Sequence, residues 1–359
     1  MSRYLLLSVL APLASLPLSA QTVVSPADRA ELEGSSFTHF PLGRASTRMQ
    51  TLHRDLPGGT LLLGHAYRRD AIQVTGAVDP MAIDLQVTVS MSPNAPNQAS
   101  ATFANNVGPS PVVVLPRTVL TLPGTARPSL DPAPGFELTI PYSVPFQVPA
   151  QGGTVCIDVE IFGNVTSAGA DKNVSVYLDA HQQYSDGRCE QPAFRTFLGC
   201  PAPGSTTNSY GTMSLWRLTG SSQLDLSIRY GVADAGNGLT RAFVLLGTGL
   251  DGSPWPLQPN CPFWSSAEVW YAMPGTMDAS GNYDGTLTGL SLLPPGYRLW
   301  CQAGSIDLGT AAMAFTDALT LVTPPTGLVP VAAARVANST DHSAATGTVS
   351  LAVPVMSFF

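Results

Sequence analysis

Glycine and proline interrupt this sequence at short intervals along its whole length, which limits the regular structure that the chain can form. The sequence holds 33 glycines and 32 prolines among its 359 residues, and the runs between them are short and rich in β-branched and aromatic residues. Long helical patterns are absent. Because glycine and proline both disfavour helix interiors, we expect many short β-strands.

Strand-like runs follow one another from Gly59 to the end of the chain. Residues 83–90 show the clearest pattern, because apolar and polar residues alternate there as in a strand with one solvated face. The runs that we expect to form strands are 61–67, 71–77, 81–90, 112–122, 136–140, 154–162, 174–179, 213–218, 224–230, 241–247, 318–322, 329–336 and 348–356. Residues 21–56 are mixed and polar, and only residues 25–31 suggest the start of a short helix.

A glycine-rich, polar segment at residues 231–238 divides these runs into two sets. Such a segment is typical of a linker between domains, and the chain is long enough for about two domains of ordinary size. We therefore predict an all-β fold of two antiparallel β-sandwich domains in tandem, of the jelly-roll or immunoglobulin-like kind. The predicted domains are residues 21–232 and residues 233–359.

Residues 255–308 hold four of the five tryptophans and two of the five cysteines. Three runs in this stretch, 268–272, 287–293 and 297–302, have the composition of strands. Residues 278–281, between the first two runs, combine aspartate, serine and glycine, which favour turns. We expect the three runs to form a meander of adjacent antiparallel strands.

The first 20 residues have the three parts of a secretory signal peptide. Arg3 supplies a positive charge, residues 4–18 form an apolar core, and Ser19 and Ala20 offer small residues for cleavage. The apolar core contains two prolines and is short for a membrane span. We expect cleavage near Ala20, export to the extracellular space or cell surface, and no membrane-spanning segment.

Five cysteines are an odd number for a chain that enters an oxidising compartment. Cys189 and Cys200 flank a turn-rich loop and form the first predicted disulfide pair. Cys261 and Cys301 form the second, joining the start of the tryptophan-rich stretch to its third strand. Cys156 is then left as a buried free thiol, which behaves as a small apolar residue.

The charge balance bears on possible partners. Charged residues make up 11% of the chain, the formal net charge is -7, and Lys172 is the only lysine. Proteins that bind nucleic acids normally carry a basic patch or stripe. The composition therefore argues against a nucleic-acid partner.

Six short runs resemble segments of a known group of proteins. They are RRDAI at 68–72, FANNVG at 103–108, VLTLP at 119–123, PFQVPAQGGTVCID at 145–158, AFVLLGTG at 242–249 and LWCQA at 299–303. The group consists of secreted, two-part, β-rich proteins that are abundant in planctomycete bacteria. The resemblance covers most of the mature chain and implies export and a β architecture. Its motifs are structural, so no site residue is carried over.

Aromatic residues are the most suggestive functional feature. The cluster comprises Trp255, Phe263, Trp264, Trp270, Tyr271 and Trp300. Flat rings with polar edges suit the faces of sugars, but large aromatics also fill cores. We expect Trp270 and Trp300 to be in the core because they lie in strands. Trp255 and Trp264 lie in proline-rich loops, and with Tyr271 they are our predicted ligand-binding residues.

Signals for metal binding or catalysis are weak, and we predict no metal, cofactor or catalytic residue. Residues 278–285 place oxygen-bearing side chains at alternate positions, but the glycine and the final acidic residue of a calcium loop are missing. The five histidines are scattered and have no metal-binding spacing. Asp158, Glu160 and Asp179 lie on or beside strands, and an acid pair of the glycosidase type among them stays an alternative.

These observations favour a secreted, non-catalytic protein that acts in surface attachment, in an extracellular matrix or in carbohydrate binding. The expected partners are polysaccharides or components of the cell envelope. Two alternatives stay open: a secreted hydrolase that acts on polysaccharide, and a structural component of the cell envelope.

Overall fold

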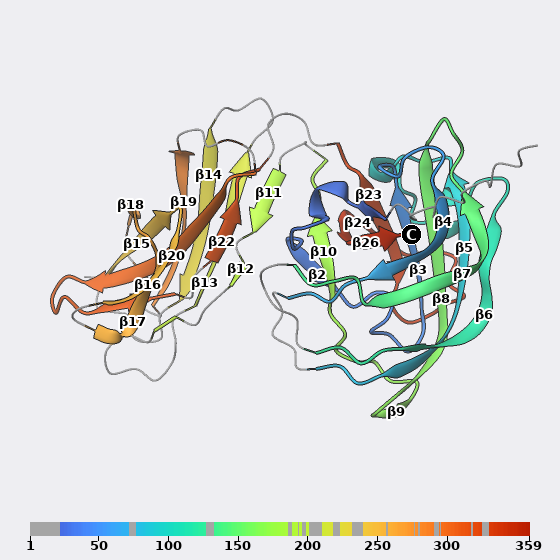
Figure 1. The fold of residues 1–359 in the computed structure, drawn as a ribbon, viewed down its shortest axis with the longest axis horizontal. Helices are drawn as coiled ribbons and strands as arrows, with labels where there is room; N and C mark the ends of the chain where they lie inside the picture. The colour runs from blue at the N-terminus through green and yellow to red at the C-terminus, as the bar shows by residue number, and fades with distance from the viewer. Residues whose placement is uncertain are drawn as a thin grey trace, which may run out of the picture.

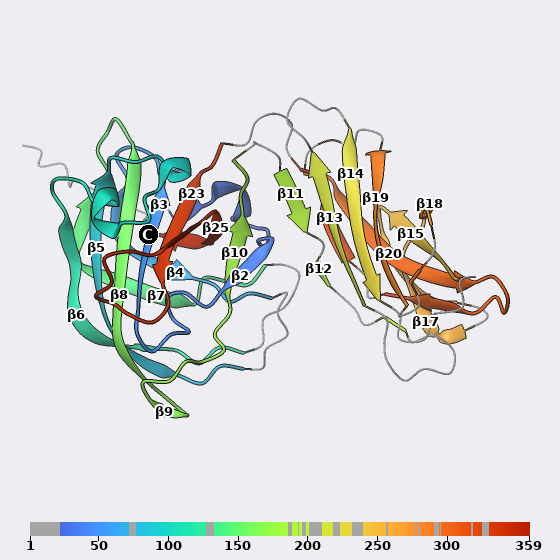
Figure 2. The same cartoon turned by 180° about the vertical axis from the view of Figure 1, so that it is seen from behind.

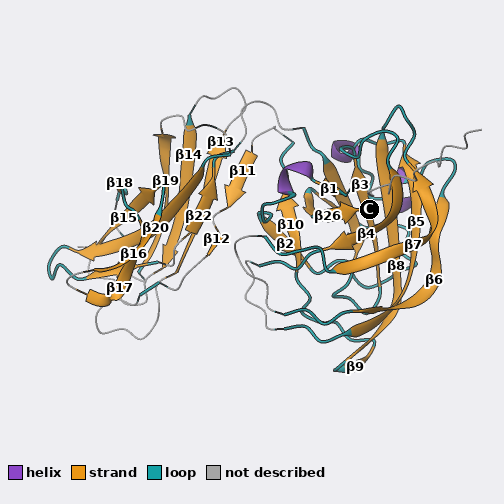
Figure 3. Ribbon diagram, viewed as in Figure 1, coloured by secondary structure: helices purple, strands orange, loops and turns teal. Residues whose placement is uncertain are grey.

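The computed structural model describes residues 22–359 except 72–76, 127–132, 186–188, 193, 196–198, 201–209, 218–222, 232–239, 256–257, 276, 279–280, 291–293, 295, 317–318 and 325–329. All strand pairings in the described residues are antiparallel, and helical structure is limited to the short 3₁₀ turns η1 (Ala27–Arg29), η2 (Pro96–Gln98) and η3 (Phe103–Asn106) (Figure 3). The predicted all-β fold is confirmed. In this part of the chain no helix has the length and apolar character needed to cross a membrane.

The first sandwich contains strands from both ends of the described chain. Its four-stranded sheet has the order β1 (Val23–Ser25), β26 (Met356–Phe358), β4 (Leu61–Tyr67), β7 (Leu138–Gln147). A three-stranded sheet has the order β2 (Ser36–Thr38), β10 (Leu178–Gln182), β25 (Ala352–Pro354). The seven-stranded sheet has the order β24 (Thr348–Ser350), β23 (Ala333–Asn338), β3 (Thr47–His53), β8 (Thr154–Thr166), β5 (Met81–Ser92), β6 (Val112–Leu122), with β9 (Gly169–Ala170) paired to β8.

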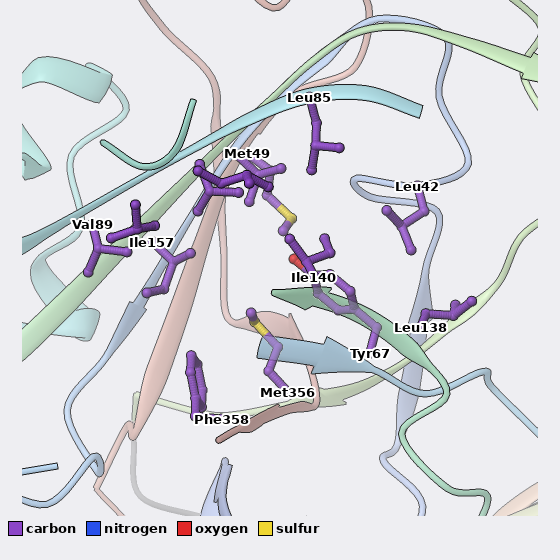
Figure 4. Packing of buried hydrophobic residues seen from close by; sticks show 14 of the residues in the cluster. Leu42, Met49, Tyr67, Leu85, Val89, Leu138, Ile140, Ile157, Met356 and Phe358 are labelled. Carbon is purple, nitrogen blue, oxygen red and sulfur yellow. The ribbon is translucent and has the colours of Figure 1, made fainter. Parts of the chain in front are cut away.

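The core of the first sandwich follows from the alternation along these strands. On β5 the apolar side chains at alternate positions, among them Leu85 and Val89, are buried, and Ile157 on β8 joins them. They pack with residues of the four-stranded sheet such as Ile140 and Phe358, which are also fully buried (Figure 4). The two sheets therefore enclose one apolar core, as in a β-sandwich.

The second sandwich contains the strands of the middle of the chain. One sheet has the order β11 (Cys189–Pro192), β13 (Tyr210–Arg217), β14 (Leu224–Gly231), β19 (Asn282–Leu290). The facing sheet has the order β12 (Phe194–Arg195), β22 (Leu319–Val322), β20 (Arg298–Asp307), β15 (Thr240–Gly247), β18 (Val269–Ala272), with β21 (Met313–Phe315) paired to β20. A separate hairpin is formed by β16 (Leu250–Trp255) and β17 (Gln258–Ser265).

The second sandwich is inserted into the first. The chain leaves the first sandwich after β10 and returns at β23, so β23 to β26 complete the sheets that β1 to β10 begin. Figures 1 and 2 show the red C-terminal strands within the lobe of the blue and green strands. The strands therefore do not divide at the predicted boundary between 232 and 233. Residues 232–239 lie outside the described residues, and they connect β14 and β15 of the same sandwich. Glycine and polar residues mark any turn, including one within a domain.

Gln183 connects the two chain segments that pass between the sandwiches. It directly follows β10, and its side chain is almost fully buried. Its backbone N–H donates to the carbonyl of Leu351 at 3.0 Å, and its Nε2 donates to the carbonyl of Ala333 at 2.8 Å. Its Oε1 accepts from the backbone N–H of Ala332 at 2.6 Å. One residue thus holds the departing chain against the returning chain.

The predicted meander in the tryptophan-rich stretch is wrong. β18 pairs with β15, whereas β19 pairs with β14 in the other sheet of the sandwich. β20 pairs with β15 and β22. A turn is nevertheless present at Asp278, whose carbonyl accepts from Gly281 N–H at 3.0 Å. The chain turns there and continues in the other sheet. The turn residues do not determine which sheet the next strand joins.

Both predicted disulfide pairs are wrong, because Cys200 is bonded to Cys261, with 5.2 Å between the Cα atoms. The backbone of Cys200 pairs with that of Phe315 in an isolated β-bridge at the six-stranded sheet. Cys189 belongs to β11 in the opposite sheet. Cys301 faces the core between the sheets, and Cys261 packs on the other side of the six-stranded sheet. The predicted free thiol of Cys156 is confirmed, and the Cys301 thiol is also free and buried. The side chain of Cys189 lies outside the described residues.

We expect peptide mapping to recover one linked pair, Cys200 with Cys261. The protein should be unfolded without reductant, alkylated and digested, so that Cys156 and Cys301 carry the alkyl group. Closing a loop of 61 residues should contribute about 4 kcal/mol in the chain-entropy model. Recovery of Cys261 linked to Cys301 would contradict the structure.

We expect Gln183→Ala to lower the free energy of unfolding by about 1–3 kcal/mol, because it leaves buried backbone groups of Ala332 and Ala333 without their partner. Urea-induced unfolding measures the change. Gln147→Ala is the matched control, because that exposed side chain also donates to a backbone carbonyl, that of Gly59 at 2.7 Å. Equal losses in the two variants would show that Gln183 has no special role at the crossing.

Candidate functional site

Among the described residues of the tryptophan-rich stretch, Trp270 is the most exposed aromatic residue. It lies on β18, the edge strand of the six-stranded sheet, and 49% of its surface is exposed. Its ring stacks on Phe243 with a centroid distance of 5.4 Å and an angle of 17°. The expected core position of Trp270 is therefore wrong. The alternation of a strand places Trp270 on the outer face of the sheet and its neighbour Tyr271 on the inner face.

The aromatic residues beneath Trp270 fix its position. Phe263 on β17 meets the Trp270 ring edge-on at 5.9 Å. Phe315 packs edge-on against Phe243 at 5.7 Å and against Phe263 at 4.9 Å. These rings form a small cluster with the disulfide between the sheet and the β16–β17 hairpin. Contacts of this kind orient an aromatic side chain before a ligand arrives.

The other aromatic candidates lie in different environments. Trp255 and Trp264 lie in β16 and β17 rather than in loops, and the side chain of Trp255 is outside the described residues. Trp264 is partly buried, and its backbone N–H donates to Oε1 of Gln302 at 3.1 Å. Trp300, expected in the core, is also only partly buried. Tyr271 lines a cavity. Ligand binding by Trp255, Trp264 and Tyr271 stays a prediction.

A cluster of polar side chains lies next to β18. The carboxylate of Glu268, two residues before Trp270, accepts from Thr248 N–H at 3.0 Å, from the Thr248 hydroxyl at 2.9 Å and from the Ser266 hydroxyl at 2.8 Å. These hydrogen bonds lower the pKa of Glu268, and the bond from Ser266 has the largest effect. Gly247 makes room for them, because a Cβ there would lie 2.4 Å from Ser266 Oγ.

The cavity lined by Tyr271 lies between the two sheets of the second sandwich and has a volume of about 370 Å³. Leu224, Leu226 and Leu290 line it from one sheet. Leu246, Val269, Leu299 and Leu321 line it from the other. Thr248 and Glu268 form its polar part. Sequence patterns do not reveal this cavity, because its leucines follow the same pattern as in a filled core.

The structure separates Asp179 from the other two acidic residues considered for catalysis. Asp158 and Glu160 lie on β8, and Asp179 lies on β10 in another sheet. Asp158 Oδ2 forms an ion pair with Arg48 Nη2 at 2.7 Å and accepts a hydrogen bond from Gln50 Nε2 at 2.8 Å. A carboxylate that is already paired with a guanidinium supports packing rather than acid catalysis.

Ser25, His53 and Asp55 come together in the first sandwich, a grouping that sequence spacing did not reveal. The Ser25 hydroxyl donates to Asp55 Oδ1 at 2.5 Å and lies 2.7 Å from His53 Nδ1. In a catalytic triad the acid would bond to the histidine, and the serine would reach a substrate. Here Ser25 and His53 are fully buried, and burial lowers the pKa of His53 to about 3. These hydrogen bonds connect β1 to the end of β3.

A second buried polar cluster contains three carboxyl groups. Oxygen atoms of Glu33, Asp70 and Asp179 lie within 4.8 Å of one another, and all three residues are buried. Arg68 Nε donates to Asp179 Oδ2 at 2.6 Å, and Arg68 also donates to the carbonyls of Arg29 and Leu32. Arg68 thus binds both a carboxylate and the backbone of the N-terminal turn.

This cluster suits a shared proton better than a metal ion. Asp179 Oδ1 accepts from Gly34 N–H at 2.8 Å, and Glu33 Oε1 accepts from Ala71 N–H at 2.6 Å. These bonds and the Arg68 ion pair occupy oxygens that calcium would need, since calcium takes six to eight oxygen ligands. Burial raises the pKa of Glu33, and repulsion from Asp179 raises it further. A protonated Glu33 removes one buried negative charge.

Comparisons with protein-family models and with curated proteins found no match to this chain.

We expect the free energy of unfolding to fall as the pH rises from about 7.5 to about 9. In this range the buried His53, His65 and His181 are neutral in both the folded and the unfolded chain, so their lowered pKa values do not oppose the effect. In this window the unfolded chain has released the Glu33 proton, whose ordinary pKa is 4.5, and the folded chain still holds it. Higher pH therefore favours unfolding, by at most about 1.4 kcal/mol per pH unit for one proton.

Glu33→Gln should flatten this pH dependence and stabilise the protein at neutral pH, as measured by urea unfolding between about pH 7.5 and 9. Glu31→Gln is the control, because Glu31 is exposed in the same turn. An unchanged slope in Glu33→Gln would rule out the proton at Glu33.

Proposed function

We propose that this chain is a secreted, non-catalytic protein that binds carbohydrate on the outer face of its second sandwich. The observation that carries the proposal is Trp270, a residue that is 49% exposed and whose ring stacks on Phe243. A ring held from beneath offers its free side to a ligand without losing conformational entropy on binding. Sugars present apolar C–H faces that pack on such rings.

Polar groups near Trp270 support the same ligand class. Glu268 and Thr248 are exposed and lie next to the strand that carries Trp270. The Glu268 carboxylate can accept hydrogen bonds from sugar hydroxyls. An aromatic face combined with a few polar groups is the usual arrangement in sites for polar organic ligands.

Secretion is part of the proposal. Residues 1–20 have the pattern of a signal peptide, and these residues lie outside the described residues. The bond between Cys200 and Cys261 agrees with an oxidising compartment. Attachment to a surface or matrix is the role that such a binding protein would serve.

A secreted hydrolase is less well supported. Of the acidic residues considered for it, Asp158 and Asp179 each form an ion pair with a buried or partly buried arginine. These pairs give both residues a structural role. Release of soluble sugar from a retained polysaccharide would nevertheless show hydrolysis, so the binding experiment should include that measurement.

The test is retention of the full mature chain, beginning at Gln21, on insoluble cellulose, chitin, xylan and purified cell-envelope fractions. We expect retention on at least one polysaccharide, and we expect Trp270→Ala to weaken it by about tenfold or more, the equivalent of about 1.4 kcal/mol. Trp270→Phe should retain part of the affinity, because it keeps a ring at this position.

Phe37→Ala is the matched control. Phe37 is 40% exposed and packs edge-on against Tyr177 at 5.2 Å, but it lies in the first sandwich. Circular dichroism confirms that each variant is folded. Retention that is equally strong in the folded Trp270→Ala variant, or absent for the wild type on every material, would overturn the proposal.

A further inference from the structure

The cavity of the second sandwich has the properties of a site for a small ligand. Its volume of about 370 Å³ is within the range of about 300–1,000 Å³ that is typical of ligand pockets. Leucines from both sheets line it, among them Leu226 on β14 and Leu246 on β15. Side chains that fully packed the space between the sheets would leave no such volume.

The cavity opens to solvent at its rim. Val269 and Tyr297 line it, yet they are 42% and 39% exposed. Val269 lies on β18, the edge strand, so the rim is at the edge of the six-stranded sheet. A ligand can therefore enter between the sheets without separating them.

Among the described residues, Glu268 is the one charged group that lines the cavity. Glu268 is exposed, and its hydrogen bonds with Thr248 and Ser266 favour the ionised carboxylate. In the part of the chain that the structure describes, no arginine, lysine or histidine forms an ion pair with Glu268. An apolar cavity with a single negative charge at its mouth complements an apolar molecule that carries a cation.

We propose that this cavity binds an amphiphilic amine, with the apolar part between the leucines and the ammonium group beside Glu268. Burial of the apolar part supplies most of the affinity. The contact with Glu268 selects an amine over an alcohol or an acid of the same length. The two sites share Glu268, but the cavity and the exposed Trp270 ring lie on opposite faces of β18, and the inference does not depend on the carbohydrate proposal.

The probes are decylamine, 1-decanol and decanoic acid, titrated calorimetrically into the full mature chain at neutral pH and below the concentrations at which they form micelles. We expect decylamine to bind most tightly and decanoate most weakly. Glu268→Gln should reduce the preference for the amine over the alcohol by about fivefold to tenfold. It should leave the affinity for 1-decanol almost unchanged.

Val269→Trp tests the place of binding. An indole at this rim position should block the cavity and abolish binding of all three probes. Val349→Trp is the matched control, because Val349 is 39% exposed and lies in the first sandwich. Thermal unfolding monitored by circular dichroism verifies that both variants are folded.

The outcomes separate clearly. Absence of binding of every probe to the folded wild type overturns the proposal. Equal affinity for amine and alcohol overturns the role of Glu268, and decylamine binding that survives in Val269→Trp overturns the cavity as its site. Polysaccharide retention that is unchanged in Val269→Trp would show that the polysaccharide does not occupy the cavity.

Discussion

The fold depends on the pairing of the two ends of the chain within one sandwich. β26 lies between β1 and β4, and β23 lies beside β3 in the seven-stranded sheet. These pairings join very distant residues, but the entropy of closing a loop grows only slowly with its length. Met356 and Phe358 are fully buried in the resulting core. The insertion of the second sandwich and the position of Gln183 at the crossings follow from this closure.

The interiors of the two sandwiches differ in composition and packing. The first holds many buried polar groups, such as Arg68 with Asp179 and Ser25 with His53, and each pair joins segments that are far apart in sequence. Such pairs stabilise one arrangement over others only when their hydrogen bonds are complete. The second sandwich has a core of leucines that leaves a cavity. This contrast places the candidate binding surfaces on the inserted sandwich.

Local patterns predicted strands well and their partners poorly. Alternation located β5, and β4 and β6 have the predicted bounds. β3 was missed because buried polar residues such as Gln50, which bonds to Asp158, hide the apolar pattern of a central strand. Trp270 was placed wrongly because alternation separates Trp270 from Tyr271 but does not say which face of an edge strand is covered. The disulfide and the buried carboxyl cluster depend on sheet order, which short segments do not encode.

Because of the insertion, the second sandwich can be completed before the first while the chain is being made. All strands of the second sandwich, from β11 to β22, precede β23 in the chain. They can pair as soon as residue 322 has emerged, whereas the first sandwich waits for the last residues, including Phe358. Until then, β26 is missing from between β1 and β4, β23 is missing from beside β3, and Met356 and Phe358 are missing from the core. A chain truncated after β22 would therefore have an incomplete first sandwich, although that sandwich begins near the N-terminus, and would keep all strands of the second.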